Sequence, residues 1–186
     1  MRSHRAVLVP AVAVGVHAQT AAPQKTPDVQ FVPTDEKIVT KMLEMAKVTK
    51  TDNLIDLGSG DGRIVITAAK RYGARGMGVE IDPALVKKAR ENAQAAGVAD
   101  RATFVEGDLF EANIRDATVI TMYLLPDLNM RLRPKLLSDL KPGTRIVSHN
   151  YDLGDWKPAQ TATVTVGSTQ HTVYFWVVPP RAAGTK

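Results

Sequence analysis

A cluster of glycines flanked by acidic side chains is the part of the sequence best suited to chemistry. It reads Asp56-Leu57-Gly58-Ser59-Gly60-Asp61-Gly62-Arg63, and Glu80 ends the next apolar run. Apolar residues before the glycines predict a short buried strand. After the glycines, the spacing of the apolar residues at 64–69 predicts a helix. Glycine at such a turn reaches backbone angles barred to other residues, and lacking a Cβ it lets a ligand lie against the main chain. The segment therefore predicts a nucleoside-cofactor site at a strand-to-helix turn.

The glycine spacing argues against a dinucleotide. The dinucleotide fingerprint has glycines at its first, third and sixth positions, whereas the sixth position counted from Gly58 is Arg63. The carboxylates of Asp56 and Asp61 would repel a pyrophosphate, but they suit a ligand with a cationic amino group and a sulfonium. Glu80 falls at a predicted strand end, where its carboxylate can accept hydrogen bonds from both ribose hydroxyls. These features predict S-adenosyl-L-methionine as the cofactor.

The end of a third predicted strand adds one more candidate. Asp108 follows the apolar run 102–105, where its carboxylate can accept a hydrogen bond from the adenine amino group. An Asp at this place also commonly caps a turn. The predicted cofactor-binding residues are Asp56, Gly58, Ser59, Gly60, Asp61, Gly62, Glu80, Ile81, Asp108 and Leu109.

Length and composition limit the other possibilities. The chain has 186 residues, 44% of them hydrophobic, which is enough for one globular domain with a full core. The absence of cysteine excludes disulfides, thiolate metal sites and a cysteine nucleophile. A formal net charge of +5 is modest, so we expect neither a nucleic-acid partner nor a membrane span.

The first thirty residues differ from the rest. Arg2 and Arg5 precede an apolar stretch at 6–16, and small side chains follow, as in a secretory signal peptide; the stretch is too short to span a bilayer. We interpret 1–18 as a candidate signal peptide, 19–30 as a linker and 31–180 as the S-adenosylmethionine-dependent domain. The alternatives for 1–18 are an apolar tail and a wrongly chosen start codon. Export to the periplasm conflicts with a cofactor made in the cytoplasm, so the location stays open.

The rest of the chain predicts alternating strands and helices. Thr34 is the expected N-cap of a helix with an apolar face from Ile38 to Ala46. Five strand-helix units followed by a hairpin predict an α/β fold, a Rossmann-like doubly wound sheet that is mostly parallel and binds ligand at the carboxyl ends of its strands. The later elements are a helix from Pro83 to a cap at Gly97, strands at 102–105, 118–124 and 145–148, a helix at 126–140 interrupted or kinked at Pro134, and hairpin strands at 161–166 and 172–178.

The turn at 56–62 together with Glu80 resembles the seven-stranded class I S-adenosylmethionine-dependent methyltransferases. A closer resemblance, over about 31–178, is to the small protein-lysine methyltransferases of archaea and their mitochondrial relatives. It implies methylation of lysine side chains of a protein substrate by direct in-line transfer. One departure is Asn150, which stands where that family usually has an acidic residue. The segments that carry the resemblance are Phe31-Val32-Pro33-Thr34, 56–64, Thr121-Met122-Tyr123-Leu124-Leu125-Pro126, Leu132-Arg133-Pro134-Lys135-Leu136, 140–145 and Val147-Ser148-His149.

Such a reaction requires positioning more than acid-base chemistry. The sulfonium is already a reactive donor, so a nucleophile must be held about 3 Å away, oriented and partly desolvated. Tyr123, at the end of the strand predicted at 118–124, is a candidate to line the transfer site; the alternative is packing under the hairpin. His149 is either a base or a hydrogen-bonded core histidine, and the second role is the commoner one.

Three functions stay open on the sequence alone. The short segment 151–159 before the hairpin leaves no room for a helical lid, which predicts an open cleft suited to a side chain on a protein surface. The alternatives to protein-lysine methylation are a small-molecule methyltransferase completed by a dimer partner and a non-catalytic module that binds S-adenosylmethionine. No pattern indicates the acceptor, the number of methyl groups added or the oligomeric state.

Overall fold

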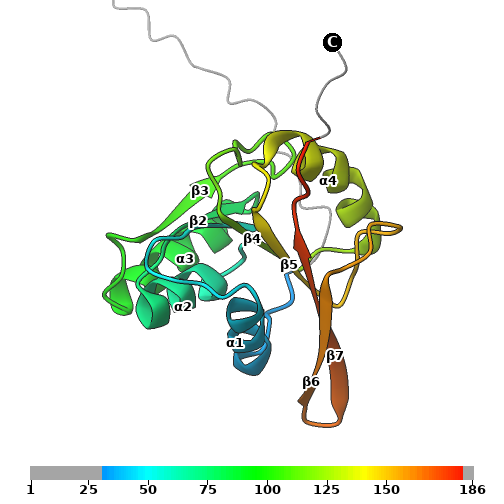
Figure 1. The fold of residues 1–186 in the computed structure, drawn as a ribbon. Helices are drawn as coiled ribbons and strands as arrows, with labels where there is room; N and C mark the ends of the chain where they lie inside the picture. The colour runs from blue at the N-terminus through cyan, green and yellow to red at the C-terminus, as the bar shows by residue number, and fades with distance from the viewer. Residues whose placement is uncertain (1–30, 182–186) are drawn as a thin grey trace, which may run out of the picture.

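A mixed β-sheet organises the described part of the chain. The computed structural model describes residues 31–181, so the predictions for 1–18 and 19–30 lie outside the described residues. Within that range seven strands pair in the order β3-β2-β1-β4-β5-β7-β6 (Figure 1). The predicted fold is confirmed, because the first five strands are parallel and the last two antiparallel. The strands are β1 Asn53–Leu57, β2 Arg75–Glu80, β3 Ala102–Glu106, β4 Val119–Met122, β5 Arg145–His149, β6 Gln160–Val166 and β7 Thr169–Val177.

Helices cover both faces of this sheet. They are α1 Glu36–Met45, α2 Arg63–Tyr72, α3 Pro83–Ala95 and α4 Pro126–Asp139. The helices α1, α2 and α3 lie on one side of the sheet and α4 on the other (Figure 1). None of the helices in residues 31–181 is long and apolar enough to cross a membrane.

The alternation of side chains along the central strands produces two cores. Leu54 of β1 packs with α1, α2 and α3, whereas its neighbour Ile55 packs with α4. Val119 and Ile120 of β4 divide in the same way. Because successive side chains of a strand point to opposite faces, each central strand contributes to both cores. This explains why the strands read as nearly continuous apolar runs.

Some expected element ends differ from those in the structure. Asp35, not Thr34, caps α1: its carboxylate accepts a hydrogen bond from Lys37 N at 2.8 Å. β4 is shorter than 118–124, because Tyr123 and the residues after it leave the sheet for a loop that ends where Pro126 begins α4. α4 continues through Pro134, so of the two effects expected of this proline the interruption does not occur.

Gly78, in the middle of β2, seats the glycine-rich turn against the sheet. A Cβ at this position would lie 2.4 Å from Ser59 Oγ and 2.6 Å from Phe104 Cδ1. The same turn is bound to β2 by hydrogen bonds from Gly58 N and Ser59 N to Val79 O, at 2.9 and 3.0 Å. The strand and the turn therefore approach so closely that no larger residue fits at 78.

We expect Gly78→Ala to lower the free energy of unfolding by about 1 to 3 kcal/mol, because the added methyl group displaces the Ser59 turn from β2. Gly107→Ala is the matched control, since a Cβ there meets only Val79 Cγ1 at 4.0 Å. Urea denaturation followed by circular dichroism measures both variants. Equal stability of the Gly78→Ala and Gly107→Ala proteins would contradict this role for Gly78.

Candidate functional site

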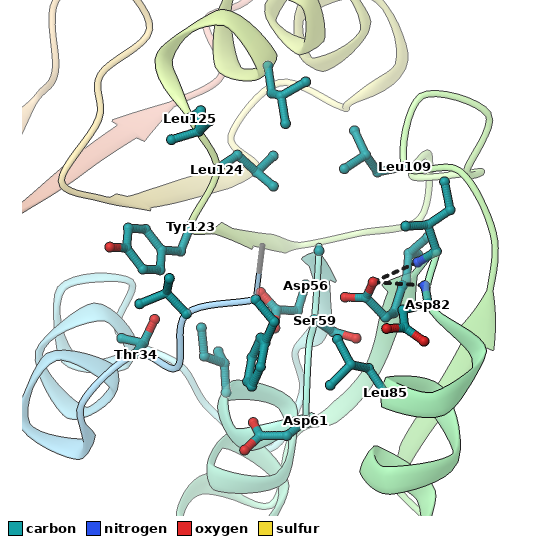
Figure 2. A pocket seen from close by; sticks show the side chains of 18 of the residues that line it. Thr34, Asp56, Ser59, Asp61, Asp82, Leu85, Leu109, Tyr123, Leu124 and Leu125 are labelled. Atoms are coloured by element: carbon teal, nitrogen blue, oxygen red, sulfur yellow. Dashed lines mark hydrogen bonds between the residues drawn. The ribbon is translucent and has the colours of Figure 1, made fainter. Parts of the chain in front are cut away.

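A cavity of about 700 Å³ lies where β1, β2 and β4 end, which is the edge at which a sheet of this kind binds its ligand. In Figure 2, Tyr123 and Thr34 lie on one side of the cavity, and Asp82 and Leu85 lie on the other. Eight of the ten predicted cofactor residues line it; Gly60 and Gly62 of the same turn do not. Those eight are Asp56, Gly58, Ser59, Asp61, Glu80, Ile81, Asp108 and Leu109.

The turn between β1 and α2 requires its glycines. Gly58, Gly60 and Gly62 have φ values of 77°, 52° and 83°, in the left-handed region that side chains with a Cβ rarely adopt. Space is restricted as well, because a Cβ on Gly60 would lie 2.2 Å from Phe31 Cε2. Glycine is therefore required at these positions by both the backbone angles and the neighbouring side chains, and of the three only Gly58 lines the cavity.

Glu80 connects the glycine-rich turn to the end of β2. One carboxylate oxygen accepts from Gly60 N at 2.8 Å, and the other accepts from Ile81 N at 2.9 Å and Asp82 N at 3.0 Å. The side chain is largely buried, with 8% of its surface exposed. Because hydrogen bonds from backbone N–H groups to a carboxylate are strong, Glu80 holds the turn and the strand end in one arrangement.

Asp56 is a buried carboxyl group at the end of β1. It is 2% exposed, and Thr121 Oγ1 donates a hydrogen bond to it at 2.7 Å. Burial raises the pKa of Asp56 to about 7, the Thr121 hydrogen bond opposes the rise, and the nearby Glu80 and Asp61 carboxylates add to it. This carboxyl group therefore changes charge near neutral pH.

The carboxylate of Asp61 is paired within the protein. The Arg63 guanidinium donates to both of its oxygens, at 2.9 and 2.6 Å, and also to the Thr34 carbonyl at 2.8 Å. The Asp61 hydrogen bond raises the pKa of Arg63 further above its already high value, against the effect of burial. Arg63 thus neutralises Asp61 and ties the turn to residues 31–34.

Asp108 has the geometry of a turn cap. Its Oδ1 accepts from Phe110 N at 2.9 Å, and the residue also lines the cavity. The two functions that the sequence leaves open for it are therefore compatible.

The rings of the two predicted catalytic residues contact each other at an interplanar angle of 36°, but the residues differ in their access to the cavity. Tyr123 lines the cavity, whereas His149 does not and is 2% exposed. Their ring centroids are 3.9 Å apart. His149 Nε2 lies 3.0 Å from His171 Nδ1, and burial together with His171 lowers the pKa of His149 to about 4. His149 is thus a neutral, hydrogen-bonded histidine beneath Tyr123.

Sequence reasoning does not single out several residues of the cavity. Tyr151 and Asp82 line it, although the sequence predicts no more than a short loop at 151–159. The sequence holds one usable signal, because Tyr151 comes just after β5 and so near the carboxyl edge of the sheet. The other apolar lining residues are Phe31, Val32, Ile64, Val79, Leu85, Phe110, Leu124, Leu125 and Leu128.

Comparison with known proteins agrees with this geometry. The model of the ANTKMT methyltransferase domain matches residues 56–160. A protein-lysine N-methyltransferase of Saccharolobus islandicus (strain REY15A) is 48% identical over 153 residues, which are 82% of this chain and 95% of that protein. The adenine nucleotide translocase lysine N-methyltransferase of Mus musculus is 40% identical over 106 residues, which are 56% of this chain and 46% of that protein.

A solved structure is also similar. It is described as an RNA methyltransferase from Salinibacter ruber in complex with S-adenosyl-L-homocysteine; it is 55% identical, covers 83% of this chain and 98% of its own, and has a TM-score of 0.76. With the glycine-rich turn, Glu80 and the seven-stranded sheet in place, the chain belongs to the ANTKMT methyltransferase family, within the class I S-adenosylmethionine-dependent methyltransferases.

Proposed function

We propose that this protein transfers a methyl group from S-adenosylmethionine to lysine side chains of protein substrates. The two relatives named as lysine N-methyltransferases support this acceptor. The observation that carries it is the 48% identity to the Saccharolobus islandicus enzyme over 95% of that protein. The charge of the cavity agrees with it: five acidic side chains line the cavity, and Arg63 is the one basic side chain among the described residues that do so. Such a cavity attracts an ammonium group and repels phosphate. The acidic residues are Asp56, Asp61, Glu80, Asp82 and Asp108.

The residues present fit the cofactor. Gly58, Ser59 and Asp61 of the turn face the cavity, and Asp56 offers a negative charge for a cationic group. Glu80 already accepts three backbone hydrogen bonds, so of the roughly four acceptor positions of a carboxylate about one stays available. We therefore assign Glu80 one ribose hydroxyl rather than two. Ile81, Asp108 and Leu109 also line the cavity and are candidates to bind the adenine of the cofactor.

S-adenosylmethionine supplies a methyl group on a sulfonium: as the new bond to nitrogen forms, the carbon–sulfur bond breaks with its electrons staying on sulfur, and the nitrogen releases a proton. The protein has to present a neutral amine. Apolar side chains near Tyr123, namely Leu124, Leu125 and Leu128, lower the pKa of an ammonium group by desolvation. Asn150 does not line the cavity, and its amide oxygen accepts a hydrogen bond from Thr172 N at 3.0 Å.

The rim of the cavity favours a macromolecular acceptor. Phe31, Val32 and Leu125 line the cavity and are nevertheless exposed large apolar side chains. Exposed apolar groups around a cleft are typical of surfaces that contact another protein. The similar RNA methyltransferase from Salinibacter ruber makes RNA the second candidate acceptor. The acidic lining of the cavity argues against RNA, because a polyanion gains affinity from positive charge.

Purified protein incubated with methyl-labelled S-adenosylmethionine and a cell lysate tests this function. We expect label in protein bands that are sensitive to protease and resistant to ribonuclease, and methylated lysine in their digests by mass spectrometry. Label only in RNA, or only in small metabolites, would overturn the proposal. Cofactor binding without any labelled product would indicate a binding module instead. The Asp56→Ala protein serves as the inactive control.

We expect the affinity for S-adenosylhomocysteine, which keeps the cationic amino group, to fall about tenfold from about pH 8 to about pH 6. A carboxyl group with a pKa of about 7 goes from mostly ionised to mostly neutral over this interval, and only the ionised form attracts the cation. Isothermal titration calorimetry measures the dependence.

Asp56→Asn provides the control for this pH dependence and should remove it. Without cofactor the same variant should be more stable than the parent above about pH 7. Because the pKa of Asp56 is higher in the folded protein than in the unfolded chain, its ionisation destabilises the folded state. This destabilisation grows as the pH rises from the ordinary pKa of an aspartate to the raised pKa of about 7. An affinity that varies with pH equally in parent and variant would assign the effect to another group.

A further inference from the structure

Tyr151 is a cavity residue without a role in the function proposed so far. It follows the end of β5 by two positions and lines the cavity together with Tyr123. The two rings are stacked with an interplanar angle of 14° and with centroids 6.3 Å apart. Because Tyr123 rests on the buried ring of His149, the aromatic pair has a fixed base on one side.

A buried polar residue of α4 holds the backbone of Tyr151. Asn129 is 0% exposed, and its amide nitrogen donates to the carbonyl oxygens of Tyr151 and Asp152, both at 3.1 Å. Ser148 Oγ donates to the same Tyr151 carbonyl at 2.6 Å. A buried amide is costly unless it is hydrogen-bonded; these bonds satisfy the nitrogen of Asn129, whereas its Oδ1 has no hydrogen-bond partner among the described residues.

The residue before Tyr151 is fixed as well. Asn150 has a φ of 63°, which turns the chain sharply after β5. Its backbone N donates to Thr172 O at 2.7 Å, and its side-chain oxygen accepts from Thr172 N at 3.0 Å. The direction in which Tyr151 leaves the sheet is therefore set by β7 and by α4 together.

The cavity has two chemically different ends. The acidic side chains belong to the ends of β1 and β2, to the turn after β1 and to the residues that follow β2 and β3, whereas the two tyrosines follow β4 and β5. Tyr123 and Asp82 lie on opposite sides in Figure 2. Aromatic faces attract alkylammonium groups, and they also pack against the methylene groups of a lysine side chain.

We propose that Tyr123 and Tyr151 form the binding site for the acceptor lysine, with Tyr151 determining its affinity and Asn129 positioning Tyr151. This inference rests on the function proposed above. Tyr151 contacts the incoming side chain directly. Asn129 acts only through the Tyr151 backbone.

Replacing the aromatic ring should weaken acceptor binding alone. We expect Tyr151→Leu to raise the apparent KM for the protein fraction of the lysate about tenfold, with kcat changed less and the affinity for S-adenosylhomocysteine unchanged. Tyr151→Phe keeps the ring and should behave like the parent. Tyr72→Leu, on α2 and outside the cavity lining, is the matched control for loss of a tyrosine.

A double-mutant cycle tests the positioning role. Asn129→Leu should also raise the apparent KM, and adding it to Tyr151→Leu should raise it no further, because both changes remove the same contact. Ser148→Ala repeats the test with a smaller perturbation if Asn129→Leu lowers the melting temperature.

Different results would overturn the proposed function and the proposed acceptor site. A parent protein that labels no lysine overturns the function and the acceptor site together. A parent that labels lysine with the same apparent KM as Tyr151→Leu overturns only the acceptor site. Additive effects of Asn129→Leu and Tyr151→Leu would reject the positioning role of Asn129.

Discussion

The carboxylate of Glu80 holds together two segments that line the cavity, the turn after β1 and the residues after β2. It accepts backbone hydrogen bonds from Gly60 in the turn between β1 and α2, and from Ile81 and Asp82 where the chain leaves β2 for α3. A neutral side chain of the same shape cannot accept all three, because its amide end would face N–H donors. The negative charge therefore has a structural purpose before any ligand is present.

The concentration of carboxyl groups around Glu80 has an energetic consequence. Asp56 is buried close to Glu80 and Asp61, and its pKa rises to about 7 because burial and these neighbours disfavour its charge. Only Asp61 has a guanidinium partner among these three. The site is therefore arranged for a positive charge that the protein itself does not provide. Such an arrangement costs stability in the free protein, as is common where residues are kept for function.

Much of this site is predictable because its signals are local. The glycines of the turn and the acid after β2 are separated along the chain by one strand-helix-strand unit, and parallel pairing brings their ends together. The predicted cap of α1 is wrong by one residue, since Thr34 and Asp35 both have capping side chains. The pairing of Asp61 with Arg63 is not predictable, because Asp61 lies in a turn whose shape the sequence pattern does not define, just before Arg63 begins α2. Tyr151 and Asn129 depend on contacts between α4 and the loop after β5, which no local pattern encodes.

The position of α4 has a mechanical consequence. Pro126 begins this helix three residues after Tyr123, and its Asn129 holds the carbonyl of Tyr151. One rigid element is thus attached to both aromatic rings, through covalent chain on one side and hydrogen bonds on the other. The distance between the two rings is therefore set largely by the placement of a single helix.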